Sequence, residues 1–464
     1  MDRLRSAGVL RWGGDLQGGE PYVSEDPLSP GRIVGFEVEL AEAIARELGV
    51  RAEFQQNNWA NLVPSLERGT FDVAMNGLEV TPDRVGRVLF TRPYYLFSER
   101  LMARKGDARI RPEIAALRGM RVGTLGGTLA YDLLRKELEP VIYEGTEEPY
   151  ADLVQQRLDA VLMDDIIAAR YGETKPELAV VGDVAEGYYA IAARADEPEV
   201  RDAVDQALAR VIERGELRRI LERWKLWGDR EQRLLAWTDR DQERMLGAPT
   251  RAPAMTWGHA LLFLKGAGVT LVLSALSMVL AIVLGMALAV ARLQGGPVLR
   301  AAAGAYVEVY RGTPVLLQLY LLYYGLAPVL RLDALTAAVI GLGMNYAAYE
   351  AEVYRGGIQA VPRGQWDAAH ALGMSSSLTL RRIVLPQAFR LALPSVTNDF
   401  IALLKDSSLV SVITVVELTK QMTITSVDLR SWLLPGLLCA ALYFAMSYPL
   451  SRKARALEAR LARG

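Results

Sequence analysis

Residues 266–291 read GAGVTLVLSALSMVLAIVLGMALAVA, and no charged side chain interrupts them between Lys265 and Arg292. A helix needs about 20 consecutive apolar residues to cross the hydrocarbon core of a bilayer, and this run is longer. We therefore predict a membrane-spanning helix here. Before Arg251, in contrast, charged residues recur every few positions. A soluble half is thus expected to precede a membrane half.

Further apolar runs follow the first predicted span. They lie at 312–330, 334–349, 391–416 and 431–451, and together they predict about five spans. The third of these runs contains Asp399, Lys405 and Asp406. Because ionisable residues are costly inside a membrane, Lys405 and Asp406 are either functional or a structural ion pair, and we assign them no role.

Arginine and lysine predict the orientation of these spans. They gather in the first loop, in the loop 352–390 and in the C-terminal tail, at Arg292, Arg300, Arg355, Arg363, Arg381, Arg382, Arg390, Arg452, Lys453, Arg455, Arg460 and Arg463. Such segments stay in the cytoplasm. With an odd number of spans and a cytoplasmic C-terminus, the N-terminal half is expected outside the cell.

The loop 352–390 has helix starts, a glycine break and a proline stop, which predict two short helices joined by a glycine turn. Small side chains at Ala368 and Ala369 would let a short helix seat closely in a groove, and Gly373 would permit the turn. An ordinary amphipathic loop helix is the competing interpretation. Asp367, Ala368, Ala369 and Gly373, followed by Ile383, Leu385 and Pro386, resemble the coupling-loop signature of ABC importer permeases, with Asp367 where the family usually has Glu.

Two other segments, Arg311–Pro314 and Leu404–Ser408, match the polar amino-acid branch of that family, and the resemblance covers most of 255–455. It implies a type I ABC importer fold, an all-α polytopic domain in the bacterial inner membrane. It also implies a separate, dimeric ABC ATPase that grips the Asp367–Gly373 loop. The permease subunit would pair with a second copy or with a related subunit.

Several function classes are disfavoured. No GxxxxGK[ST] motif is present, so ATP hydrolysis is expected from the partner, and the chain itself is expected to be neither an enzyme nor a cofactor binder. The formal net charge of −1 and the lack of a basic stripe disfavour nucleic acid. One cysteine, Cys439, and two distant histidines, His259 and His370, make a disulfide framework impossible and a metal site improbable.

The soluble half shows α/β patterning in two successive groups. The predicted segments are 9–13, 35–48, 51–55, 62–67 and 71–75 in the first group, and 120–125, 128–138, 160–163, 188–193 and 199–227 in the second. Their order, with the motifs Gly35–Leu40, Thr81–Arg84, Phe90–Tyr95 and Gly126–Thr128, resembles the two-lobed type II periplasmic binding proteins of solute-binding family 3. That family places interlobe crossings near 101–105 and 189–194.

An α-amino acid presents a carboxylate and an ammonium on one carbon, so a selective pocket needs a planar double donor and an anion. Arg84, which ends the motif TPDR, and Asp164, which follows the strand 160–163, could supply them. Either residue could instead belong to a surface ion pair. The resemblance puts them in opposite lobes, where closure would bring them together.

Five more residues complete the predicted ligand site, namely Thr128, Gly77, Glu79, Trp59 and Asp15. Thr128 begins a helix whose amides favour anions, and it could equally be a plain N-cap. Trp59 is placed by the resemblance against the ligand, with interlobe packing as the alternative. With Asp15, Glu79 and Asp164 facing a single Arg84, the pocket is expected to favour basic or amide side chains.

The predicted domains are 1–228 for binding, 229–256 as a charged and proline-containing linker, and 257–464 as permease. Within the first domain, lobe one comprises 1–101 and 195–228, and lobe two comprises 106–188. No secretory signal is visible at the start, so we expect one upstream of Met1. The rival function, a ligand-gated channel or receptor with the same binding fold, is disfavoured because both lobes finish before the first span.

Overall fold

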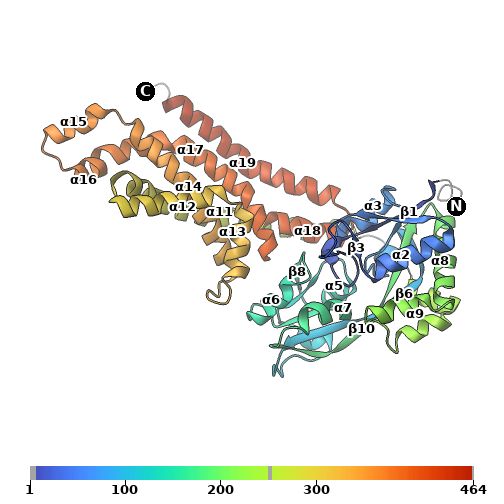
Figure 1. The fold of residues 1–464 in the computed structure, drawn as a ribbon. Coiled ribbons are helices and arrows are strands. Elements are labelled where there is room, and N and C mark those ends of the chain that lie inside the picture. Colours follow the sequence, from blue (N-terminus) through green and yellow to red (C-terminus); the bar gives the residue numbers. More distant parts are fainter. Residues whose placement is uncertain (1–6, 249–252, 462–464) are drawn as a thin grey trace. The chain divides into compact units, whose positions relative to one another are not determined.

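The computed structural model describes residues 7–248 and 253–461. The chain divides into two compact units, Met1–Pro253 and Ala254–Gly464 (Figure 1). Each unit has its own buried core, and each is described by itself.

The first unit is built on an eight-stranded mixed sheet in the order β4-β1-β5-β10-β6-β9-β7-β8. The strands are β1 (Val9–Gly14), β4 (Arg51–Gln56), β5 (Val73–Ala74), β6 (Val88–Arg104), β7 (Val122–Leu125), β8 (Val141–Tyr143), β9 (Ala160–Asp164) and β10 (Leu178–Arg194), with a separate pair β2 (Ser24–Glu25) and β3 (Ile33–Val34). The predicted α/β class is confirmed.

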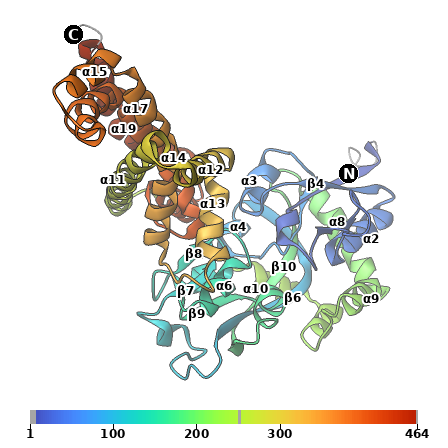
Figure 2. The same cartoon turned by 60° about the vertical axis from the view of Figure 1, so that its left-hand side comes forward.

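Two long antiparallel strands, β6 and β10, join the lobes. At one end β10 pairs with β5 of lobe one, and at the other end β6 pairs with β9 of lobe two. Figure 2 shows β7, β8 and β9 grouped apart from β4. Glu99–Ala103 of β6 already pair with β9, and Ala192 and Ala193 of β10 already pair with β5, so β6 changes lobe before Glu99 and β10 changes lobe before Ala192. The segment 101–105, which the resemblance marked as the first crossing, therefore follows the change of lobe.

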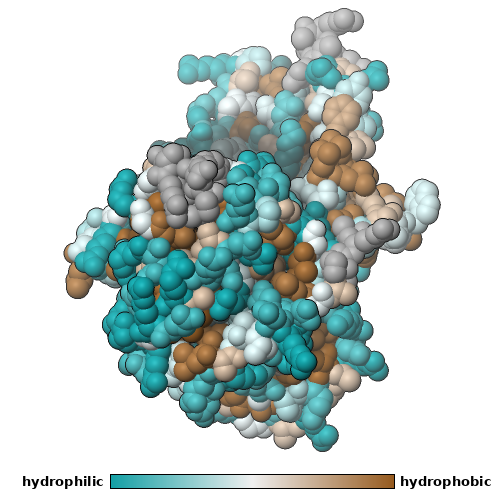
Figure 3. Space-filling model, turned by 90° about the vertical axis from the view of Figure 1, so that its right-hand side faces the viewer, coloured by the Kyte–Doolittle hydropathy of each residue, from teal (hydrophilic) through white to brown (hydrophobic). Residues whose placement is uncertain are grey.

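Helices flank both lobes. They are α2 (Phe36–Leu48), α3 (Leu62–Glu67), α4 (Pro82–Val85), α5 (Leu129–Leu134), α6 (Glu148–Val154), α7 (Asp165–Ile167), α8 (Pro198–Glu213) and α9 (Glu216–Arg223). Helix α2 buries Leu40, Ala43, Ile44 and Leu48, the apolar face that its helical spacing predicts, and it packs against α8 and α9. Figure 3 views the first unit from one side, where hydrophilic side chains predominate.

The segment 229–246 belongs to the first unit rather than to a free linker. It forms a short 3₁₀ helix, Glu231–Ala236, and α10 (Asp239–Leu246). Arg230 pairs with Asp165 of lobe two, and the Gln242 amide donates to the Thr91 carbonyl of lobe one at 3.2 Å. Leu234 is buried in the domain core. The expected helix of the linker is therefore present but docked, and the expected tether around Pro249 and Ala252 lies outside the described residues.

The second unit is entirely helical over the part that the structure describes. Its elements are α11 (Trp257–Gln294), α12 (Pro297–Gly312), α13 (Val315–Tyr320) with a π-turn to Gly325, α14 (Ala334–Ala360), α15 (Arg363–Ala371), α16 (Ser376–Thr379), a π-helical turn Leu380–Val384, α17 (Leu385–Asp406), a 3₁₀ turn Ser407–Ile413, α18 (Leu418–Leu429) and α19 (Leu433–Leu461). Helix α14 packs along α11 and against α17. By length and composition, the helices at Trp257–Gln294 and Leu433–Ala456 are suited to cross a membrane, and Val315–Gly325 is a shorter apolar helix.

The five predicted spans each contain helix, with different bounds. In the run 312–330, α12 ends at Gly312 and only Val315–Gly325 is helical beyond it, because the chain turns at Thr313 and Pro314 and again after Gly325. The loop predicted at 352–390 is shorter than expected, because α14 continues to Ala360 and α17 begins at Leu385. The number of spans stays a prediction.

Candidate functional site

Arg84 reaches from lobe one to lobe two. It sits on α4, a short helix that Pro82 starts by supplying a preset φ after Thr81. One guanidinium nitrogen donates to the Glu79 carbonyl at 2.8 Å, and the other donates to the Gly127 carbonyl of lobe two at 2.9 Å. The guanidinium also lies 4.9 Å from the centre of the Trp59 ring. Burial lowers the pKa of Arg84, and the Glu79 charge opposes that shift.

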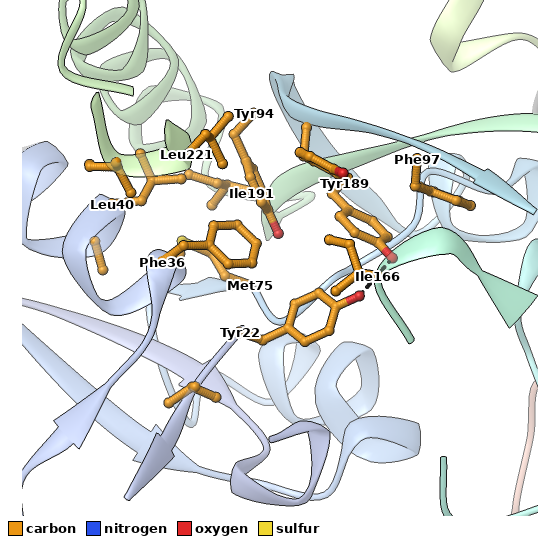
Figure 4. Close-up of a cluster of buried hydrophobic side chains, with 14 of the residues drawn as sticks. Tyr22, Phe36, Leu40, Met75, Tyr94, Phe97, Ile166, Tyr189, Ile191 and Leu221 are labelled. Carbon is orange, nitrogen blue, oxygen red and sulfur yellow. Dashed lines mark hydrogen bonds between the residues drawn. The ribbon is translucent and has the colours of Figure 1, made fainter. Parts of the chain in front are cut away.

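Asp164 ends β9 and caps the next helix, α7. One carboxylate oxygen accepts from the Ile167 amide at 2.8 Å and from the Tyr22 hydroxyl at 3.2 Å. The Tyr22 and Tyr189 hydroxyls lie 3.0 Å apart and point toward each other (Figure 4). Burial raises the pKa of the Asp164 carboxyl to about 6. Lobe two thus presents a buried carboxylate that is linked to a tyrosine of lobe one.

The Glu79 carboxylate lies at the N-terminus of α5, the helix start that the sequence suggested as a site for an anion. Its carboxylate accepts from the Leu129 amide, the first amide of α5, at 2.5 Å. A helix N-terminus favours an anion, so this contact across the lobes is favourable without a ligand. Burial raises the pKa of Glu79, the Arg84 charge lowers it, and Asp164 raises it further. Glu79 therefore lies within electrostatic reach of both Arg84 and Asp164.

Thr128 serves as the N-cap of α5. Its hydroxyl accepts from the Tyr131 amide at 3.1 Å and donates to the Leu125 carbonyl at 2.8 Å. The capping role, one of the two alternatives, is confirmed. The hydroxyl hydrogen is donated to the Leu125 carbonyl in this structure. A role of Thr128 as a donor to the ligand stays a prediction.

Asp15 has a local structural task. Its two oxygens accept from the Gln17 amide at 3.0 Å, the Gln56 side chain at 3.0 Å and the Trp59 amide at 2.8 Å. These neutral donors hold the carboxylate in place and leave its negative charge, so its contribution to an acidic pocket stays a prediction. Aspartate side chains often accept from a backbone amide of their own turn, as Asp15 does from the Gln17 amide.

Trp59 and Gly77 also help to build the site, through hydrogen bonds to other residues of lobe one. The Trp59 indole donates to the Asn76 carbonyl at 3.0 Å, and its ring faces Arg84. The Gly77 amide donates to the buried carboxylate of Glu37 at 2.7 Å. Gly77 has φ +58°, and a Cβ there would lie 2.9 Å from the Tyr22 ring. Glycine thus permits both a left-handed turn and the close approach of Tyr22.

Sequence reasoning missed Tyr189 and Glu99. Both lie on the two long strands, and Glu99 pairs in register with Asp164. Glu99 is 1% exposed, and neither of its carboxylate oxygens has a hydrogen-bond partner among the described residues. A signal was present, since Glu99 stands in the otherwise largely apolar strand segment YYLFSERLMA. Across residues 7–248 and 253–461 no group of acidic, histidine or cysteine side chains is placed to hold a metal ion.

In the second unit, the predicted coupling residues lie on and after α15. Asp367 and Ala368 are not buried, Ala369 is buried, and Leu372 is 83% exposed. Gly373 follows with φ +79°, and nothing among the described residues lies within 4 Å of a Cβ built there. The helix and the glycine turn are present as predicted, and α15 offers an uncovered face within this unit.

Together, a two-lobed domain with Arg84 and Asp164 buried at contacts between its lobes, and a helical unit with an exposed short helix, fit a solute-binding domain joined to a transport permease. Residues 17–226 match the bacterial extracellular solute-binding proteins, family 3, and residues 281–463 match the binding-protein-dependent transport system inner membrane component. The chain belongs to the family of amino-acid ABC transporter permeases, and it carries a solute-binding domain in front of the permease.

Individual relatives of the permease half support this assignment. The chain is 40% identical over 184 residues to a probable amino-acid ABC transporter permease protein, YckA of Bacillus subtilis (strain 168), covering 39% of this chain and 81% of that protein. It is 36% identical to the L-cystine transport system permease protein TcyB of the same organism, covering 46% and 96%. The protein is thus a subunit of an ABC importer for amino acids. Among solved structures, a mutant of ArgBP from T. maritima is 28% identical with a TM-score of 0.44, covering 48% of this chain and 97% of that chain.

Proposed function

We propose that the cleft of the first unit binds one α-amino acid with a basic or amide side chain, with Arg84 on its carboxylate and Asp164 on its ammonium. The observation that carries this proposal is that the two groups project from opposite lobes into one buried, acidic cluster. Arg84 offers a planar double donor. Asp164 offers a carboxylate that also accepts hydrogen bonds from the Ile167 amide and the Tyr22 hydroxyl.

In this proposal the ligand carboxylate displaces two internal contacts. Glu79 holds the first amide of α5, and Arg84 holds the Gly127 carbonyl. A ligand carboxylate that accepts from both the Arg84 guanidinium and the first amide of α5 would keep the lobes linked. It would also release the Glu79 carboxylate toward the ligand side chain. The Arg84 guanidinium and the first amide of α5 would therefore join the lobes in both states, through internal contacts in the empty domain and through the ligand carboxylate in the loaded one.

The membrane half is proposed to work by alternating access. A separate pair of ABC ATPase subunits grips Asp367–Gly373 on the cytoplasmic side, and their closure turns the pathway of a dimeric permease outward. The exposed face of α15 and the free space around Gly373 support this docking role. The first unit is proposed to lie outside the cell.

The full-length chain in lipid nanodiscs, titrated calorimetrically with the twenty amino acids, tests the binding proposal. We expect saturable binding of a few amino acids that carry basic or amide side chains. Binding of none of them, or binding only of acidic or aliphatic amino acids, would contradict it.

A pH dependence should follow from Asp164. Its pKa is raised to about 6 by burial, so below that pH the carboxyl is mostly neutral and cannot pair with the ligand ammonium. Affinity should therefore fall as the pH decreases from 7 to 5, by up to about tenfold per unit. Calorimetry of the Asp164→Asn variant should give weaker binding with a flatter profile over this range. A variant profile as steep as that of the wild type would contradict the assignment.

A further inference from the structure

Glu99 is a buried carboxyl with no hydrogen-bond partner among the described residues. Its side chain is 1% exposed, and both oxygens lack hydrogen-bond partners among the described residues. Burial without a partner disfavours the charged form, so the pKa of Glu99 is raised well above its ordinary value. A cation that reaches the carboxyl would favour its charged form again.

The position of Glu99 is set by the pairing of β6 with β9. Glu99 lies directly opposite Asp164 in this antiparallel pair, and directly paired residues project their side chains from the same face of the sheet. Asp164 contacts Tyr22 of lobe one on that face. Glu99 therefore faces the cleft beside the group proposed to hold the ligand ammonium.

The charged groups that act most strongly on Glu99 are all acidic. They are Glu79, Asp164 and Asp165, and each adds to the rise that burial causes in the pKa of Glu99, while the nearby Ala130 amide lowers it. Asp165 already has a cation, because it pairs with Arg230. Glu79 accepts from an amide of α5, and Asp164 accepts from the amide of α7 and from a tyrosine. Within this cluster of described residues, Glu99 alone has neither a paired cation nor a hydrogen bond of ordinary length and angle.

A neutral amino acid would leave this imbalance in place. Its carboxylate and ammonium would satisfy Arg84 and Asp164 and bring no net charge, so Glu99 would remain buried and unpaired. A guanidinium or ammonium at the end of the side chain would bring one positive charge and several donors. A side-chain amide would bring donors but no charge.

Resting on the proposed binding of an α-amino acid, we propose that Glu99 is a specificity-determining residue that receives the cationic end of a basic side chain. The substrate class is then narrower than basic or amide. It comprises L-arginine, L-lysine or L-ornithine, and side-chain amides are discriminated against.

The test compares L-arginine with L-citrulline, which replaces the guanidinium by a neutral urea of nearly the same shape. Calorimetry on the full-length chain in nanodiscs should show wild type favouring arginine over citrulline by about 100-fold or more, since a buried carboxylate is left unpaired by the neutral analogue. Glu99→Gln, which keeps the shape and removes the charge, should reduce that preference to below about tenfold. Citrulline affinity should be unchanged or improved.

Two further variants complete the experiment. Glu53→Gln removes one negative charge from the exposed edge strand β4 and should leave the preference intact. Glu99→Asp keeps the charge and should retain most of it. In the absence of ligand, Glu99→Gln should melt at the same or a higher temperature than wild type, because it removes a carboxyl that is ionised in the unfolded chain at neutral pH and is disfavoured in that form when buried.

The outcomes are separable. An unchanged preference in Glu99→Gln, or an equal loss of arginine and citrulline affinity with a lowered melting temperature, overturns the role of Glu99 and leaves the amino-acid site standing. A wild type that binds amino acids but does not separate arginine from citrulline also overturns it. Failure of the wild type to bind any amino acid overturns the proposed function instead.

Discussion

Replacing Gly373 by valine is expected to abolish ATP-driven uptake and to leave amino-acid affinity unchanged. Gly373 has φ +79°, a conformation in which a β-branched residue is strained, so valine should rebuild the turn that follows α15. The turn belongs to the second unit, and the residues that build the cleft belong to the first. Uptake of labelled amino acid into proteoliposomes containing the partner ATPase, together with calorimetric titration, measures both effects.

The choice of substitution supplies the control. No atom of the described residues lies within 4 Å of a Cβ at this position, so steric contact is not the cause of the expected loss. Asparagine tolerates left-handed backbone better than other side chains. Gly373→Asn should therefore keep a substantial part of the uptake. Full transport by the valine variant would refute the coupling role of the turn, and weakened ligand binding would show that the two units do not act separately.

Replacing Arg84 by alanine should lower amino-acid affinity by at least about 100-fold, because charge-assisted, bidentate contacts to a carboxylate are among the strongest polar contacts. The variant also removes the bond from Arg84 to Gly127 and the cation over Trp59. Looser closure of the lobes should therefore add to the loss. Calorimetry on the full-length chain measures the change.

Arg84→Lys separates the two causes. Lysine keeps the charge and loses the planar fork, so it should recover only a small part of the affinity. Arg87→Ala is the matched control, since Arg87 lies one turn further along the chain and pairs with the partly exposed Glu67. Wild-type affinity in Arg84→Ala would refute the proposed contact with the ligand carboxylate.

Local patterns predicted most of the first unit's elements to within a few residues. Leu62–Glu67 is as predicted, and Val9–Gly14 and Phe36–Leu48 differ by one residue at one end. Strand β6 was not predicted as a whole, because Arg92, Pro93 and Glu99 interrupt its apolar run. Its 17 residues are held instead by pairing with β10 and β9, which are distant in sequence. Local propensity carries no information about such pairing.

The site was predictable where a residue's task is set by a local motif. Thr128 caps α5, which is one of the two roles that its sequence position predicts. The structural task of Asp15 was not predicted, because the sequence shows its charge and not the three donors that surround it. Glu99 was missed because its importance comes from the register opposite Asp164, which only the assembled sheet defines.

Docking of 229–246 onto the first unit shortens the connection to the permease. Only residues 247–256 separate the end of α10 from the start of α11, a reach of about 35 Å at full extension. In the proposed mechanism, a receptor on so short a connection stays at its permease, and it must load, deliver and reload within a single transport cycle. A surplus of loaded receptors cannot accumulate, so at scarce substrate the uptake rate should follow the occupancy of this one cleft. Selectivity and rate of uptake are then limited by the same binding event.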